Sequence, residues 1–229
     1  MENRDVNFMQ LEVMAKARAD LLPQVTFVGG CTTILLVDES AHFGVRKTDD
    51  VDVIVNVATL LEYHQFAEAL RRLGFREDSD GPICRWLIAS ELGDIKLDVM
   101  PTNEGILGFS NRWYETAINN AVEIPLSSGI VIKVISLAYF LATKFEAFGS
   151  RGNGEFFSHD LEDVIFVMEN RNRLIFELMD CDKEVKQYLA HQAVLLLNDD
   201  FLNVLPGLLN HSASARGVEN SLKIMSSWI

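Results

Sequence analysis

The sequence has few cysteines and no long apolar run. Its three cysteines (Cys31, Cys84 and Cys181) are isolated and form no Cys-x-x-Cys pair, so we expect neither a disulfide framework nor a zinc site. No run of about 18 apolar residues is present, which argues against a membrane-spanning helix. The polar N-terminus also lacks the apolar stretch of a signal peptide. We therefore expect a cytoplasmic protein in a reducing environment, with no membrane partner.

Basic residues are scarce as well. The chain has 20 Lys and Arg against 33 Asp and Glu, which gives a net charge of −13. This balance argues against a broadly basic surface that would hold nucleic acid without specificity, but it leaves room for a local basic patch. With 229 residues, of which 48% are hydrophobic, the chain is long enough for one large domain or two small ones.

The hydrophobic periodicity predicts an α+β protein in two parts. We expect a mixed sheet with flanking helices over residues 1–135 and a helical bundle over residues 136–229. One helix is expected over residues 58–73, with Leu60, Leu61, His64, Ala67 and Leu70 on its inner face. The other expected helices are 5–21, 31–37, 113–120, 136–148, 159–169, 183–197, 201–209 and 218–228. The expected strands are 25–28, 49–55, 84–89, 94–100, 122–126 and 129–134, with a loop over 38–46.

Residues 27–55 contain the main group of candidate functional residues. Gly29-Gly30 follows a short apolar strand and allows a sharp turn with close approach of the backbone to a ligand. Asp50 and Asp52 lie two residues apart on the next strand, so their carboxylates share one face. Paired like charges in a buried strand repel each other and lose solvation, which a divalent metal would offset. Taken alone, however, an Asp-x-Asp pattern is usually a turn or a surface pair.

A third carboxylate, Asp98, lies within the apolar stretch IKLDVM. If its strand lies beside residues 49–55, three carboxylates meet on one face of the sheet. Oxygen ligands of this kind suit Mg²⁺, which completes its coordination with water and substrate phosphates. Gly29-Gly30 before a helix would present backbone N–H groups to phosphate oxygens. The other interpretation of Asp98 is a strand-end residue that faces water.

These motifs resemble the DNA polymerase β-type nucleotidyltransferase superfamily. The matching residues are Val28-Gly29-Gly30 and Asp50-Val51-Asp52-Val53. Within it, the pattern Arg46-x-Thr48-x-Asp50-Val51-Asp52 resembles the AbiEii/AbiGii toxin-type group. A second block, Lys144-x-x-Ala147-x-x-x-Arg151 followed by His159-Asp160-x-x-Asp163, resembles the same group. The chain departs from the pattern in a longer gap between Gly30 and Asp50, with VDESAHFG as the apparent insertion, and in His159 where a fixed cation is common.

The resemblance implies a magnesium-dependent nucleotidyltransferase, with Mn²⁺ as the alternative metal and ATP or another NTP as substrate. Asp50, Asp52 and Asp98 would bind metal, and Asp98 would also accept the proton of the incoming hydroxyl. Gly29 and Gly30 would cradle phosphate. Because Gly30 replaces a serine of many relatives, a hydroxyl contact to phosphate would come from Thr32 or Thr33.

The second block has structural and functional interpretations side by side. Lys144 interrupts an apolar helix stripe, either as a lysine at the edge of the stripe or as a cation that holds the triphosphate. Asp160 either favours the helix dipole or orients Lys144 and the nucleotide, and Asp163 equally suits helix packing. Arg46 either contacts phosphate or forms an ion pair with an aspartate. Arg151 either contacts phosphate or substrate or is a solvated loop residue.

Three functions remain open at this level. The resemblance favours transfer of NMP to a hydroxyl of RNA, such as a tRNA 3′ end, or of a protein, in a toxin–antitoxin or phage-defence setting with an antitoxin as partner. The net charge of −13 favours a small-molecule acceptor of the antibiotic type instead. The third is a non-catalytic binding module of the same fold, against which the three carboxylates argue.

Overall fold

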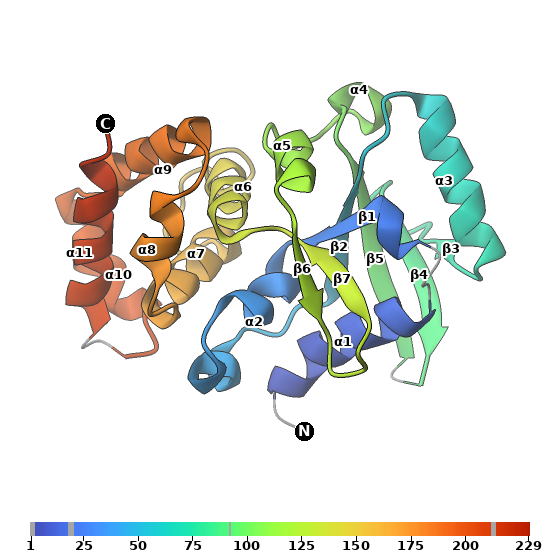
Figure 1. Cartoon of the computed structure of the whole chain (residues 1–229), viewed down its shortest axis with the longest axis horizontal. Coiled ribbons are helices and arrows are strands. Elements are labelled where there is room, and N and C mark those ends of the chain that lie inside the picture. Colours follow the sequence, from blue (N-terminus) through green and yellow to red (C-terminus); the bar gives the residue numbers. More distant parts are fainter. Residues whose placement is uncertain (1–2, 18–20, 92, 212–213) are drawn as a thin grey trace. The chain divides into compact units, whose positions relative to one another are not determined.

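A computed structural model of the chain describes residues 3–17, 21–91, 93–211 and 214–229 (Figure 1). The chain divides into two compact units, Met1–Thr32 with Lys47–Ser136 and Thr33–Arg46 with Leu137–Ile229. A mixed sheet with helices precedes a helical region, which confirms the predicted α+β class. The single boundary near residue 135 stays a prediction about the domains. The second unit also takes in Thr33–Arg46, from within the longer gap between Gly30 and Asp50.

The first unit is built on one sheet, of seven strands among the residues described. Their order is β3-β4-β5-β2-β1-β7-β6, with β2 between β1 and β5 (Figure 1). β2 pairs with β5 and β1 with β7 in parallel, and the remaining neighbours are antiparallel. The strands are β1 (Val25–Val28), β2 (Asp50–Val55), β3 (Arg76–Glu77), β4 (Arg85–Ser90), β5 (Gly93–Pro101), β6 (Val122–Pro125) and β7 (Val131–Val134). The helices of this unit are α1 (Asn3–Ala17), η1 (Leu22–Gln24), η2 (Gly30–Thr32), α3 (Leu60–Arg72), α4 (Glu104–Leu107) and α5 (Tyr114–Asn119).

One face of this sheet is apolar and is covered by α1 and α3. Val53 and Leu97 lie around a small apolar space with Met14 of α1 and with Phe66 and Leu70 of α3. All five side chains are buried. Burial of each is worth roughly 1.5–3 kcal/mol relative to exposure. Because strand side chains alternate, this apolar packing turns the neighbouring residues of β2 and β5 to the opposite face.

The predicted inner face of α3 was right at Ala67 and Leu70 but wrong at Leu60, Leu61 and His64, which are exposed. Leu60 and Leu61 are exposed, whereas Tyr63 and Phe66 are buried together with the expected Ala67 and Leu70. The helix begins after Thr59, whose hydroxyl accepts a hydrogen bond from the backbone of Glu62, so Leu60 and Leu61 fall in the solvated first turn. The two aromatic side chains bury more apolar area than the leucines would, and they determine which face packs.

The second unit is helical. Its core is formed by α6, α7, α9 and α11, in which α6 packs against α7 and α9, and α9 against α11. Lys144 lies within a run of buried α6 residues that extends from Leu137 to Phe145. The helices are α2 (Thr33–Leu36), η3 (Glu39–Gly44), α6 (Leu137–Gly149), α7 (His159–Asn170), α8 (Leu174–Met179), α9 (Lys183–Leu196), α10 (Asp199–Leu208) and α11 (Ala215–Ser226).

Residues 33–46 are hydrogen-bonded to the C-terminal end of α7 and to the residues just after it. The backbone N–H of Asp38 donates to the carbonyl of Asn170 at 3.0 Å, and the Asp38 carboxylate accepts from the N–H of Asn172 at 3.0 Å. A Cβ on Gly44 would lie 2.4 Å from Nδ2 of Asn210 and 3.0 Å from the ring of Phe166. The apparent insertion is therefore a packed part of the second unit.

Several smaller elements differ from the sequence prediction. The expected loop over 38–46 contains the 3₁₀ segment η3, and the short α4 and α8 were not predicted. Residues 18–20 of the helix predicted over 5–21, and Leu92 of the turn between β4 and β5, lie outside the described residues. Within the described ranges, no helix is both long and apolar enough to cross a membrane.

Candidate functional site

Three carboxylates lie on the face of the sheet opposite α1 and α3. Asp52 of β2 is the register partner of Asp98 of β5, and Asp50 lies two residues before Asp52 on the same face. Their strand neighbours Val51 and Val53 are buried on the other side. The structure thus brings together the three residues that the sequence predicted as a carboxylate cluster. Asp98 is largely buried, whereas Asp50 retains about a third of its side-chain exposure.

A guanidinium that the sequence analysis missed lies between two of these carboxylates. Arg85 of β4 donates from Nε and Nη2 to the two oxygens of Asp98, each at 2.7 Å, and from Nη2 to Oδ2 of Asp50 at 2.7 Å. Hydrogen bonds to Asp98 are the largest influence on the pKa of Arg85, and they raise it despite partial burial. Arg85 is therefore a fixed positive charge that bridges β2 and β5.

The turn after β1 packs directly against Asp52. Gly29 has φ +73°, and a Cβ at this position would lie 1.9 Å from Oδ2 of Asp52. Only glycine combines this left-handed backbone with space for the carboxylate. The Gly29 turn and the Asp52 side chain are thus one packed arrangement, although they are 23 positions apart in the sequence.

The two threonines after the turn are buried. Thr32 donates from Oγ1 to the Gly29 carbonyl at 2.8 Å, and its N–H donates to the same oxygen at 3.2 Å. This hydroxyl therefore stabilises the turn. Thr33 belongs to the second unit, and its hydroxyl is buried without a hydrogen-bond partner among the described residues. A contact of either hydroxyl with phosphate stays a prediction.

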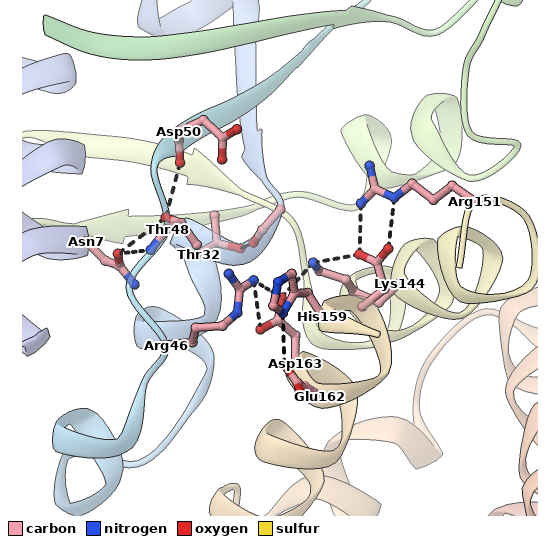
Figure 2. Close-up of polar contacts among 12 residues, drawn as sticks. Asn7, Thr32, Arg46, Thr48, Asp50, Lys144, Arg151, His159, Glu162 and Asp163 are labelled. Carbon is pink, nitrogen blue, oxygen red and sulfur yellow. Dashed lines mark hydrogen bonds and ion pairs between the residues drawn. The ribbon is translucent and has the colours of Figure 1, made fainter. Parts of the chain in front are cut away.

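Helix α1 holds the start of β2. The side-chain oxygen of Asn7 accepts from the backbone N–H of Thr48 at 3.0 Å and from its hydroxyl at 3.3 Å (Figure 2). The same hydroxyl also lies 3.2 Å from the carbonyl of Asp50, so its single proton is shared between the two oxygens. Asn7 is fully buried. This chain of hydrogen bonds fixes the backbone at the first carboxylate of the cluster.

The second unit contains a separate buried charge cluster. The ammonium of Lys144 lies 3.0 Å from Oδ1 of Asp160 and 2.7 Å from Oδ2 of Asp163 (Figure 2). Arg151 binds both oxygens of Asp160 at 2.9 Å, and Arg46 binds Asp163 at 3.2 Å. Figure 2 shows these side chains converging from the end of the 33–46 segment, from α6 and the loop after it, and from α7.

The charges of this cluster stabilise one another. Burial by itself would lower the pKa of Lys144, but the charges of Asp163 and Asp160 and hydrogen bonds to them raise it. Burial would raise the pKa of Asp160, but hydrogen bonds from Arg151 and the Lys144 charge hold it below its usual value. Lys144 is therefore not a lysine that reaches solvent at a helix edge. It is a paired ammonium within the unit.

The remaining predicted residues of this block are solvated. Arg151 anchors its guanidinium on Asp160 although its side chain is 74% exposed. His159, also 74% exposed, lies 3.0 Å from Oε2 of Glu162 one turn along α7. Both therefore combine local pairing with access to solvent.

The carboxylate face fits a divalent cation in the kind of donor it offers. Three aspartates on adjacent parallel strands supply the oxygen ligands that Mg²⁺ and Mn²⁺ prefer. Among the residues that the structure describes, however, no group of three or more His, Cys, Asp or Glu is arranged to hold a metal ion. Asp50 and Asp98 are directed at Arg85 instead.

No family model and no curated protein matches the chain. Among solved structures, an antigenic nucleotidyltransferase-like protein from Paracoccidioides brasiliensis is similar over 92% of this chain and 96% of its own, with 19% identity and a TM-score of 0.51. The chain has a nucleotidyltransferase-like fold. The STING-associated CdnE c-di-GMP synthase from Capnocytophaga granulosa also matches, over 96% of this chain and 81% of its own, with 12% identity and a TM-score of 0.32.

The nucleotidyltransferase-like fold agrees with the broader of the two resemblances read from the sequence. The narrower placement in the AbiEii/AbiGii group stays a prediction.

Arg85 was missed because its strand carries no motif. It had a signal nonetheless: counting back from the β4–β5 turn, where Ser90 pairs with Gly93, places Arg85 opposite Asp98.

Proposed function

We propose that this chain is a magnesium-dependent nucleotidyltransferase that moves NMP from an NTP to a hydroxyl acceptor. The observation that supports this most strongly is the register of β2 and β5, which brings Asp52 and Asp98 side by side with Asp50 on the same face. The Gly29 turn packed on Asp52 supports it further, because a phosphate-binding turn and metal-binding carboxylates have to be neighbours in such a reaction.

Asp50, Asp52 and Asp98 would hold Mg²⁺ or Mn²⁺. A divalent cation bound there would neutralise charge on the phosphate oxygens and on the departing pyrophosphate. The backbone N–H groups at Gly29 and Gly30 would donate hydrogen bonds to phosphate oxygens, since such turns make anion-binding concavities.

The acceptor hydroxyl oxygen attacks the α-phosphorus of the NTP and forms a new P–O bond. The bond between the α-phosphorus and the oxygen that bridges to the β-phosphate breaks, and pyrophosphate leaves with that electron pair. Asp98 accepts the proton of the hydroxyl as a general base. Both oxygens of Asp98 are hydrogen-bonded to Arg85, so the guanidinium has to withdraw before Asp98 can take this role.

The cations of the second unit belong to the proposal through the sequence resemblance. Lys144 would neutralise the triphosphate, Arg46 and Arg151 would contact phosphate or substrate, and Asp160 would orient Lys144. The distance of 3.0 Å from the Lys144 ammonium to Asp160 supports the last of these roles. The exposed guanidinium of Arg151, held at one edge by Asp160, supports a role in binding an anion.

For the acceptor, the resemblance to AbiEii/AbiGii toxins favours a hydroxyl of RNA, such as a tRNA 3′ end, or of a protein. The setting would be a toxin–antitoxin or phage-defence pair with an antitoxin as partner. Two observations favour other functions. The net charge of −13 favours a cationic small molecule as acceptor. The bridging of Asp50 and Asp98 by Arg85 favours a non-catalytic binding module.

The test is transfer of label from each α-³²P-labelled NTP in the presence of Mg²⁺, with cellular RNA, cellular protein or aminoglycosides added separately. We expect label on one acceptor class with the wild type and none with Asp52→Ala. Asp49→Ala is the matched control, because Asp49 is the exposed residue just before β2 and lies outside the cluster. It should transfer label at the wild-type rate.

Each outcome has a defined meaning. Transfer that persists in Asp52→Ala would contradict the carboxylate assignment. Absence of transfer to all three acceptor classes, together with absence of NTP binding in an equilibrium measurement, would favour the binding module. Label on an aminoglycoside and not on RNA or protein would establish the small-molecule acceptor.

A further inference from the structure

We propose that Arg85 is an intramolecular counter-cation that competes with the divalent metal for Asp50 and Asp98, so that the site loads metal only when this guanidinium moves away. The inference rests on the proposed function, because it concerns the same carboxylates. It adds a residue with a defined effect on metal affinity, which no motif of the sequence assigns.

The geometry of Arg85 is that of a strong ion pair. It donates to both oxygens of Asp98 and to one oxygen of Asp50, each at 2.7 Å. Its backbone lies directly opposite Asp98 in the antiparallel pair of β4 and β5, so the side chain reaches the carboxylate across one strand. The arginine side chain is only 17% exposed, which protects these bonds from water. Bidentate charge-assisted bonds of this length are the strong class of hydrogen bond in proteins.

A metal ion and this guanidinium need the same oxygens. Both oxygens of Asp98 accept from Arg85, so its carboxylate faces the arginine, and Asp50 is turned toward the same nitrogen. A divalent cation bound by these oxygens would lie close to the guanidinium, and two like charges at such a distance repel strongly in a partly buried site. The two cations are therefore alternatives.

Arg76 provides a matched comparison. It also forms an ion pair with an aspartate of β5, Asp94, but this pair is exposed, with 60% of the arginine and 44% of the aspartate side chain accessible. Neither residue belongs to the carboxylate cluster. Loss of Arg76 removes one positive charge from the same sheet, so it controls for the change in net charge that any Arg→Gln variant carries.

The experiment is an equilibrium titration of Mn²⁺ without nucleotide, with free Mn²⁺ measured by electron paramagnetic resonance, for the wild type, Arg85→Gln and Arg76→Gln. We expect Arg85→Gln to bind Mn²⁺ about tenfold to a hundredfold more tightly than the wild type, the range expected when one or two charge-assisted hydrogen bonds no longer have to be broken. Arg76→Gln should bind as the wild type does. Arg85→Lys, which keeps the charge but loses the bidentate fork, should lie in between.

A second measurement covers a failure of Arg85→Gln to fold. The wild-type Arg85 Nε–H signal in a ¹⁵N NMR spectrum, assigned as the resonance absent from Arg85→Lys, should shift or exchange faster when Mg²⁺ is added. An affinity for Mn²⁺ that is equal or lower in Arg85→Gln would overturn the inference, as would an unchanged Nε–H signal in metal-saturated protein. If the wild type nevertheless transfers NMP, the proposed function stands without it. If no variant binds metal, the inference also fails, and the label-transfer assay decides separately on the function.

Discussion

Among the described residues, two charged clusters surround their aspartates with different numbers of cations. On the sheet of the first unit, Asp50 and Asp98 share the single guanidinium of Arg85. In the second unit, Asp160 and Asp163 are surrounded by Lys144, Arg46 and Arg151. The first arrangement leaves more negative than positive charge on these residues, and the second leaves more positive than negative.

Under the proposed function, the first cluster would gain from an added cation, whereas the second stabilises the fold of its unit in addition to the roles proposed for Lys144 and Arg151. Carboxylates that outnumber their cationic partners gain from an added metal ion. Carboxylates that already have several cationic partners gain nothing further, and their value lies in holding together α6, α7 and the end of the 33–46 segment (Figure 2). Loss of one carboxylate from the first cluster should therefore reduce metal binding, whereas loss of one charge from the second should reduce stability.

The largest effect on stability is expected for Lys144→Met. This change leaves Asp160 and Asp163 buried without the cation that both share, and breaking a buried ion pair in this way costs about 3 kcal/mol or more. The free energy of unfolding from a urea titration followed by circular dichroism measures it. Lys183→Met, at an exposed position at the start of α9, is the control and should change stability by less than about 0.5 kcal/mol. Equal stability of the two variants would contradict a structural role for the network.

The second prediction concerns how the contribution of Asp160 to stability changes at acid pH. Because its pKa is lowered in the folded protein, its contribution to stability is present above the unfolded-state pKa of about 3.9 and is lost as the pH falls through and below that value. Asp160→Asn should be less stable than the wild type at pH 7, and the difference should shrink below pH 4. Thermal melts from pH 7 to pH 3 measure this. Asp180→Asn, at an exposed site, should follow the wild-type curve; a constant gap for Asp160→Asn would argue against the linkage.

The third prediction compares two glycines. Gly29 and Gly108 both have positive φ, +73° and +83°, so alanine at either should cost about 1–2 kcal/mol of backbone strain. A Cβ on Gly29 would also displace the Asp52 carboxylate, whereas nothing lies within 4 Å of a Cβ on Gly108. Gly29→Ala should therefore abolish metal binding and transfer, while Gly108→Ala keeps both. Metal affinity that is equal in the two variants would show that the Gly29 turn is not coupled to the cluster.

The smallest effect is expected where residues 33–46 join α7. Asp38→Ala removes the acceptor of the Asn172 N–H and should cost about 1 kcal/mol. Hydrogen exchange should then become faster in residues 33–46 than in the core of α6. Glu39→Ala, at the neighbouring exposed position, should leave the exchange rates unchanged. Faster exchange across the whole second unit would instead indicate that the segment is integral to its core.

Local signals in the sequence predicted much of the fold. Alternation along β2 and β5 placed the aspartates opposite the apolar face, and the glycines after β1 predicted the turn. The inner face of α3 was wrong because the position of its cap and the burial of two aromatic residues, not the spacing of leucines, determine which side packs. The packing of residues 33–46 on α7 was not predicted, since it depends on contacts between segments more than 120 residues apart.

The sequence predicted the three carboxylates of the candidate site. It missed two residues that contact these carboxylates or hold their strand in place. Asp50, Asp52 and Asp98 were found because carboxylates in apolar strands are unusual. Arg85 and Asn7 were missed because arginine and asparagine are ordinary residues whose roles here come from pairing across strands and from the packing of α1 on the start of β2. The roles of the site residues in binding metal and nucleotide stay predictions.

The most direct test of the account compares Asp52→Asn with Asp163→Asn in a single-turnover transfer of α-³²P-labelled NMP, at a temperature where circular dichroism shows both to be folded. We predict that Asp52→Asn is as stable as the wild type or more so, yet transfers no label. Asp163→Asn should be less stable but retain transfer. Label transfer by Asp52→Asn, or its complete loss in folded Asp163→Asn, would contradict the assignment of the chemistry to the carboxylates of the sheet.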